Sequence, residues 1–155
     1  PKSNLALDAL RRVLSIAFTD SIREEKGGAY GVGVQCELDC NSRPNSLLKI
    51  GFRTGPEKYA ALMPIVYRQL AHVAQGRINP ESIRKIKAYL KKAHQQETLI
   101  NDYWNSIVYQ QLRYGIDLHS DYDALVDQLS AADIQHVAQA IIKSNRRIEI
   151  TMKSE

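Results

Sequence analysis

The sequence has few cysteines and no long hydrophobic run. No stretch of the 155 residues approaches the roughly 18 consecutive apolar residues that a membrane-spanning helix requires. The first residue is proline, and no signal-peptide pattern precedes the first predicted helix, so we expect the chain to be a fragment of a longer protein. These absences exclude a membrane-spanning segment from the expected architecture.

Only two cysteines occur, Cys36 and Cys40, and neither has the histidine neighbours of a zinc site. On an extended strand they would lie about 13 Å apart, at about 3.3 Å per residue, which is too far for a disulfide. A turn over residues 39–42 would shorten that distance. The sequence is therefore compatible with a disulfide between Cys36 and Cys40 and with two free thiols.

Length and composition fit one globular domain over residues 1–155. The hydrophobic fraction is 44 %, which is ordinary for a folded protein. A domain of this size can bury about 68 to 70 % of the surface of its unfolded chain, enough for a core of its own. We expect a single domain.

The charge balance is basic, with a formal net charge of +4. Five basic residues lie on one side of a predicted helix: Arg84, Lys85, Lys87, Lys91 and Lys92. The other side of that helix is apolar, so the charges are those of an amphipathic surface helix. No nucleic-acid-binding module accompanies them, and we predict no nucleic-acid partner. The basic surface would suit an acidic face of another domain or an acidic peptide.

The first half of the chain predicts a helix followed by a hairpin. Apolar residues recur at spacings of three and four from Asn4 to about Lys26, where Gly27 and Gly28 end the helix. A strand follows to about residue 40. A turn over residues 41–45 then leads to a second strand over residues 47–54, which predicts an antiparallel hairpin.

The second half predicts helices and one last strand. A helix starts after residues 55–57, with Pro64 inside it, and Asn79 before Pro80 starts another that runs to about residue 98. Further helices are expected over residues 100–114 and 122–129, and from Ser130 to Lys143. Alternation over residues 147–152 predicts a final strand. This order predicts an α+β fold, an antiparallel sheet with helices packed on one face.

The most informative stretch joins the first helix to the first strand. Arg23 lies on the last helical turn, and Tyr30 opens the strand seven residues later, after the double glycine. Two side chains that project from two rigid elements into the same space form a preorganised site. The alternatives are a favourable interaction of Arg23 with the helix dipole and ordinary strand packing of Tyr30.

This run resembles the arginine-to-tyrosine signature in the C-terminal half of the pitrilysin/insulinase (M16) family of zinc metallopeptidases. The resemblance extends over most of the chain, because the hairpin, the Asn79-Pro80 helix start and the helix opening at Ser130 follow that family's order. It implies the metallopeptidase LuxS/MPP-like fold, with the first strand of the domain missing. It also implies a C-terminal substrate-binding domain that closes a catalytic chamber.

The resemblance further implies that zinc is bound by a separate N-terminal domain, through a helical His-x-x-Glu-His. The nearest approach here is His94 with Glu97 three residues on, but Thr98 stands where the second histidine would be. We expect no metal ligand in this chain and interpret His94 as part of a solvated helix face. Tyr30 and Arg23 are then expected to bind substrate and polarise the scissile carbonyl.

The expected partners are a peptide substrate and the zinc-bearing N-terminal half of the same protein. Bacterial relatives predict a location in the periplasm or cell envelope. The alternative function is a noncatalytic homologue that acts as a scaffold or assembly subunit, and a third is an unrelated interaction domain. Four aromatic residues near one helix are interpreted as core and interdomain packing, or else a peptide pocket: Tyr103, Trp104, Tyr109 and Tyr114.

Overall fold

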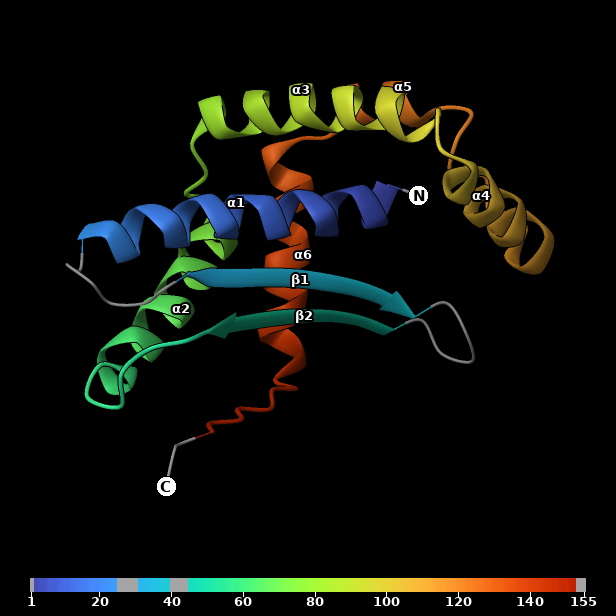
Figure 1. Ribbon diagram of the computed structural model, residues 1–155. Helices are drawn as coiled ribbons and strands as arrows, with labels where there is room; N and C mark the ends of the chain where they lie inside the picture. The colour runs from blue at the N-terminus through green and yellow to red at the C-terminus, as the bar shows by residue number, and fades with distance from the viewer. Residues whose placement is uncertain (1, 25–30, 40–44, 153–155) are drawn as a thin grey trace.

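The computed structural model describes residues 2–24, 31–39 and 45–152, and these form six helices and two strands (Figure 1). The elements in chain order are α1 (Lys2–Glu24), β1 (Val32–Asp39), β2 (Asn45–Phe52), α2 (Tyr59–Ala74), α3 (Pro80–Glu97), α4 (Asn101–Tyr114), α5 (Tyr122–Gln128) and α6 (Ala131–Ser144). This order matches the predicted one except at its C-terminal end.

The two strands form an antiparallel hairpin with one covered face. Val34 pairs with Ile50, and both pack against the core, whereas Gln35 and Lys49 on the alternate positions are exposed. α1 lies alongside β1, and α6 passes behind the hairpin (Figure 1). Because the side-chain period of a strand is two, only one face needs helices over it. The predicted α+β fold is confirmed.

A pair of glycines interrupts the outer face of this hairpin. Gly33 lies opposite Gly51 in the register, next to the pair formed by Val34 and Ile50. A Cβ atom added at Gly51 would meet no atom within 4 Å, and one added at Gly33 would meet only the Gly51 carbonyl oxygen, at 3.8 Å. The backbone is therefore uncovered by side chains at this point.

The core is built around α1. Its buried face carries Leu7, Leu10, Leu14 and Phe18, which are at most 1 % exposed. Their spacing of three and four places them on one stripe of the helix. α1 contacts β1, α2, α3, α5 and α6, so most of the other elements pack directly against it.

The predicted helix starts and stops have the expected geometry. The Asn79 side chain accepts a hydrogen bond from the backbone N–H of Glu81 at 2.9 Å, with Pro80 as the first helical residue. Ser130 and Asp133 form a reciprocal capping box at the start of α6. Gly115 ends α4 in the left-handed conformation, with φ of 65°.

The predicted final strand is wrong. Residues 146–152 have no regular structure, and Ile148, Ile150 and Met152 are exposed. The segment is anchored near its start, where the Tyr67 hydroxyl donates to Glu149 and Arg147 lies over the Tyr67 ring. Alternating apolar residues form a strand only against a neighbouring strand, and in the described part of the chain β1 and β2 pair only with each other.

Two further expectations concern cysteine and the membrane. Cys36 has a free thiol, whose pKa is raised mainly by burial against the core, and Cys40 lies outside the described residues. Among the helices that the structure describes, none has the length and apolar character needed to cross a membrane.

Truncation of the α1 stripe tests its role in stability. We expect Phe18→Ala to lower the free energy of unfolding by about 3 to 5 kcal/mol, because it removes a fully buried ring and leaves a cavity. Ile16→Ala on the same helix is the control, since Ile16 is 38 % exposed. Urea denaturation measures both variants. Equal losses would show that the stripe does not carry the core.

Candidate functional site

The end of α1 and the start of β1 form the corner that the sequence motif predicts. Arg23 is the second-last residue of α1, and β1 begins at Val32 at the same end of the molecule (Figure 1). The side chain of Arg23 and the whole of Tyr30 lie outside the described residues. The structure thus describes the two elements that flank the motif, and the convergence of the two side chains stays a prediction.

Gly31 connects this corner to β1. Its φ is +151°, a conformation that residues with side chains rarely adopt, and no atom lies within 4 Å of the place where a Cβ would stand. A glycine is therefore required here by the backbone rather than by a close neighbour. Gly27 and Gly28, which are expected to end the first helix, lie outside the described residues.

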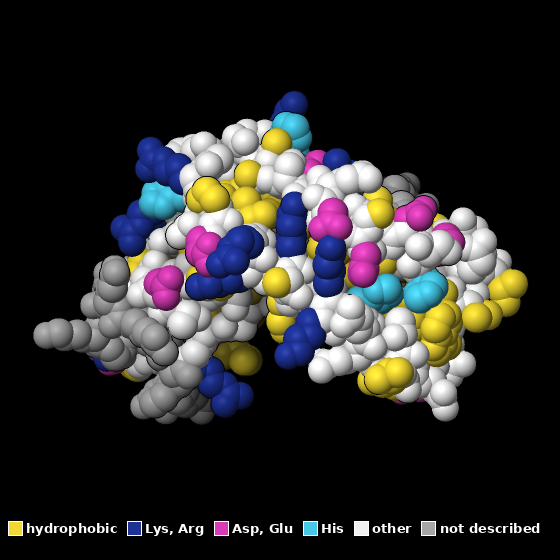
Figure 2. Space-filling model, turned by 90° about the horizontal axis from the view of Figure 1, so that it is seen from above, with side chains coloured by type: hydrophobic (Ala, Val, Ile, Leu, Met, Phe, Trp, Pro, Cys, Tyr) yellow, Lys and Arg dark blue, Asp and Glu magenta, His cyan; other side chains and the backbone are white. Residues whose placement is uncertain are grey.

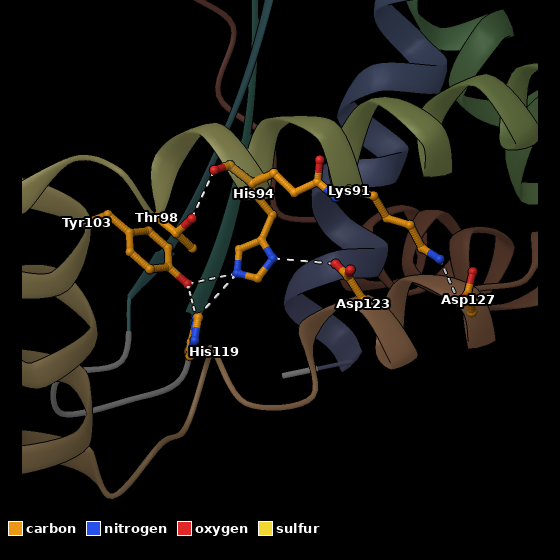
Figure 3. A network of polar contacts seen from close by, with 8 residues as sticks. Lys91, His94, Thr98, Tyr103, His119, Asp123 and Asp127 are labelled. Carbon is orange, nitrogen blue, oxygen red and sulfur yellow. Dashed lines mark hydrogen bonds and ion pairs between the residues drawn. The ribbon is translucent and has the colours of Figure 1, made fainter.

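A second group of polar side chains joins α3, α4, α5 and the loop before α5. We call His94, Tyr103, His119 and Asp123 the histidine cluster (Figure 3). The Tyr103 hydroxyl lies 2.9 Å from His94 Nε2 and 2.7 Å from His119 Nδ1. The other ring nitrogen of His94, Nδ1, lies 3.4 Å from an Asp123 carboxylate oxygen. One hydroxyl therefore connects two imidazoles, one of which faces a carboxylate.

One assignment of protons satisfies this cluster. If His94 carries its proton on Nδ1, facing Asp123, then Nε2 accepts from the Tyr103 hydroxyl. His119 Nδ1 then donates to the Tyr103 oxygen. The rings are also packed, with His94 at 4.1 Å from the Tyr122 ring and His119 at 4.7 Å from Trp104. The cluster is held in place by stacking as well as by hydrogen bonds.

The two tyrosines near the cluster have raised pKa values. Burial raises the pKa of Tyr122 to about 12, and the charges of Asp8 and Glu97 add to the effect. The pKa of Tyr103 is also raised, first by burial and then by the charges of Glu97 and Asp117. Both hydroxyls are therefore protonated at neutral pH, and Tyr103 can donate to a histidine.

The cluster positions α4. No residue of α4 is buried, and its attachment to the rest of the chain includes the Tyr103 contacts and a hydrogen bond from Trp104 Nε1 to the Thr98 carbonyl, at 2.8 Å. Among the described residues, no group of three or more His, Cys, Asp or Glu could hold a metal ion. The arrangement supports a structural junction, and the residues do not fit zinc.

One sequence interpretation is wrong in this region, and another is wrong in part. The side chain of His94 is only 11 % exposed, so it does not belong to a solvated helix face. The aromatic residues of α4 are not part of the core, because none of them is buried, whereas their packing against another domain or a peptide stays a prediction. His119 lies 25 residues beyond His94, and no local spacing rule joins such distant residues. The sequence signal for this cluster is limited to the number of aromatic and histidine residues in and near α4.

Tyr103→Phe tests whether the cluster holds α4. Loss of the hydroxyl leaves His94 and His119 without their shared partner, and we expect amide hydrogen exchange in α4 to accelerate about tenfold. Tyr109→Phe is the control, because Tyr109 lies on the same helix and is 51 % exposed. Unchanged exchange in Tyr103→Phe would show that other contacts hold the helix.

Asp117 gives a pH-dependent test of the loop that carries His119. The pKa of its carboxyl is lowered from 3.8 to about 2 because it accepts hydrogen bonds from the Ser120 side chain and from the backbone N–H groups of Ser120 and His119. The stabilisation is complete above pH 3.8 and is lost as the pH falls through about 2. We expect the urea midpoint of Asp117→Asn to lie below wild type at neutral pH and to converge with it near pH 2. A difference that does not change with pH would contradict this assignment.

Comparison with solved structures shows the same fold in several proteases. A periplasmic protease from Escherichia coli, PqqL, matches with a TM-score of 0.73 and 20 % identity, over 89 % of this chain and 15 % of that one. A protease from Helicobacter pylori matches with a TM-score of 0.72 and 20 % identity, over 90 % of this chain and 34 % of that one. Both similarities concern the fold, and this chain spans 15 % of one of these two structures and 34 % of the other.

A third solved structure is the ferredoxin protease FusC, as a mutant in complex with Arabidopsis ferredoxin. It matches with a TM-score of 0.73 and 16 % identity, over 90 % of this chain and 16 % of that one. No curated protein sequence matches this chain.

The sequence profile of the peptidase M16 inactive domain matches residues 1–90. This match covers more than half of the chain and includes α1, the hairpin, α2 and the first half of α3. The solved proteases share the same arrangement of elements over nearly the whole chain. The chain therefore belongs to the peptidase M16 family, as a C-terminal domain of the inactive type.

Proposed function

We propose that this chain is the C-terminal, non-zinc-binding domain of a zinc-dependent metalloendopeptidase. It closes the catalytic chamber over a bound peptide and contributes Arg23 and Tyr30 to it. The observation that supports this most strongly is the α1–β1 corner, at which α1 ends one residue after Arg23 and β1 begins two residues after Tyr30. The M16 profile covers the corner completely.

The chemistry that the corner would perform is charge stabilisation. Attack on a peptide carbonyl places negative charge on its oxygen, and a hydrogen-bond donor aimed at that oxygen lowers the barrier. The Tyr30 hydroxyl would be that donor, and the Arg23 guanidinium would bind the substrate at a second point. The zinc-bearing N-terminal half would supply the metal and its activated water, since the described residues of this chain do not fit a zinc site.

The second candidate is a noncatalytic M16 homologue that serves as a scaffold or assembly subunit. The exposed apolar residues of α4 favour protein contacts, but they would suit both functions. A His-x-x-Glu-His motif elsewhere in the full-length protein would distinguish the two functions, because the peptidase needs this motif to bind zinc and the scaffold would lack it. A periplasmic or cell-envelope location fits the peptidase, since the similar protease PqqL is periplasmic.

The test is cleavage of a mixed fluorogenic peptide pool by the full-length protein. We expect chelator-sensitive activity that falls at least about tenfold in Tyr30→Phe, because removal of one such donor costs on the order of a hundredfold in other enzymes. Arg23→Ala should lose activity by a similar factor. Circular dichroism and the urea midpoint should stay near those of wild type.

Two matched variants separate catalysis from structure. Arg23→Lys keeps a positive charge at the C-terminal end of α1, so it preserves any helix-dipole contribution while it loses the planar guanidinium. We expect it to remain about tenfold less active than wild type. Tyr109→Phe removes an exposed tyrosine hydroxyl far from the corner and should be fully active. Complete inactivity of zinc-loaded wild type would instead support the scaffold.

A further inference from the structure

The structure contains a cavity between residues 4–12 of α1 and residues 90–97 of α3, which we call the α1–α3 cavity. Its volume is about 330 Å³, within the range of small-molecule sites. Leu118, Tyr122 and Leu125 line a third side, from α5 and the loop before it. In Figure 1, α3 and α5 lie on one side of α1 and the hairpin lies on the other. The cavity is therefore separate from the α1–β1 corner, which lies at the other end of α1.

The floor of the cavity is apolar. Leu5 and Leu90 line it and are 8 % and 3 % exposed, and both belong to the hydrophobic core. Ala93 and Leu125 add two further apolar side chains. Core packing fixes the shape of this floor, so it offers a preformed surface to the apolar part of a ligand.

One end of the cavity carries a net positive charge. Arg11 and Arg12 each donate to the Asp8 carboxylate, at 2.8 Å, so these three residues together have a net charge of +1. Asp8 and Arg12 line the cavity. The Arg12 guanidinium lies over the Tyr89 ring, at 4.2 Å from its centroid, which fixes its plane. A guanidinium has five N–H donors, so Arg12 retains donors for an anionic ligand group after its Nε bonds to Asp8.

The other end of the cavity carries a negative charge. Glu97 lines it there and follows Tyr89 by eight residues, which is about 12 Å along the axis of α3. Glu97 is the last residue of α3, where the helix dipole disfavours a carboxylate. Within the part of the chain that the structure describes, no hydrogen bond or ion pair joins Glu97 or the Tyr122 hydroxyl to another side chain. Both groups therefore suit a ligand that brings its own donors.

The face of the molecule that carries α3 has both signs of charge. Figure 2 views this face and shows basic and acidic side chains next to one another in its middle, near the two histidines of the cluster. A surface for a polyanion or a polycation would carry one sign of charge over a wide area. The mixture of signs instead suits a ligand that has one charge of each sign.

From this geometry we propose that the α1–α3 cavity binds a short peptide of about three residues whose two ends are free. The terminal ammonium of the peptide lies at Glu97 and the Tyr122 oxygen, and the terminal carboxylate accepts hydrogen bonds from Arg12. The middle side chain lies on the apolar floor. An extended tripeptide spans about 10 Å, close to the separation of the two charged ends of the cavity. A single amino acid holds its two charges too close together to reach both.

This inference does not rest on the proposed function, because none of the residues that line the cavity belongs to the α1–β1 corner. The test is isothermal titration calorimetry of the full-length protein with the tripeptide Ala-Leu-Ala, in the presence of a chelator. Three matched peptides carry one change each: an acetylated amino end, an amidated carboxyl end, or serine in place of leucine. Free leucine is the fourth comparison. We expect Ala-Leu-Ala to bind at least about fivefold more tightly than each of these four ligands.

Variants of the protein then locate the binding site. We expect Glu97→Gln and Arg12→Gln each to weaken binding about fivefold or more. Glu97→Gln should also remove the difference between the free and the acetylated peptide. Arg11→Gln is the matched control for Arg12, because Arg11 donates to the same Asp8 carboxylate but is not among the residues that line the cavity. Glu81→Gln, at the other end of α3, is the control for Glu97. Urea midpoints show that each variant is folded.

Cysteine labelling tests whether the cavity is open in the full-length protein. Ala93 lines the cavity, and Ala93→Cys adds only one sulfur atom there. We expect maleimide to label this cysteine in the free protein. Ala-Leu-Ala at about three times its Kd should slow the labelling about fourfold. Mass spectrometry locates the labelled site, because Cys36 and Cys40 are also present.

Five results would overturn the proposal. One is the absence of binding by Ala-Leu-Ala, and another is equal binding of the peptide when either end is blocked. The third is binding that Glu97→Gln and Arg12→Gln leave unchanged. The fourth is failure of maleimide to label Ala93→Cys without peptide, because another segment of the protein would then fill the cavity. The fifth is loss of binding in Tyr30→Phe, which would place the peptide at the α1–β1 corner. None of these measurements records peptide cleavage, so the proposed function stands or fails separately.

Discussion

Burial of the apolar stripe of α1 is the constraint on which the rest of this structure depends. Leu7, Leu10, Leu14 and Phe18 are excluded from solvent because β1, α2, α3, α5 and α6 surround the helix. This packing fixes the axis of α1 relative to β1. The position of the α1–β1 corner, where Arg23 lies, is therefore set by elements that come much later in the sequence, such as α5 and α6. A change in the core would move the motif even if Arg23 and Tyr30 were untouched.

The fold has two parts that differ in how they are held. The body is held by apolar burial, which is non-directional and tolerant of small shifts. α4 is held at its base by the histidine cluster and by the indole hydrogen bond to Thr98, contacts that depend on direction and distance. Loss of these few contacts would therefore release α4 while the body remains folded.

Most of the architecture could be predicted from local patterns. The periodicity from Asn4 to Ile22, the Asn79-Pro80 start and the capping box at Ser130 each depend on residues within one or two helical turns, and each is confirmed. The histidine cluster could not be predicted, because His94 and His119 meet only through the path of the chain around α4. The predicted strand over residues 147–152 is wrong for a related reason. Alternation is a property of one segment alone, whereas a strand forms only when a second segment pairs with it.

The paired glycines of the hairpin give the corner a mechanical property. Gly33 and Gly51 face each other one register position from the start of β1, and no side chains interlock across the sheet at that pair. A strand segment without side chains resists bending less than its neighbours. The hairpin is thus less stiff at the Gly33–Gly51 pair than at its two neighbours, the pair of Val34 with Ile50 and the pair of Val32 with Phe52. A small bend at this pair would change the angle at which the chain enters β1 from the α1–β1 corner.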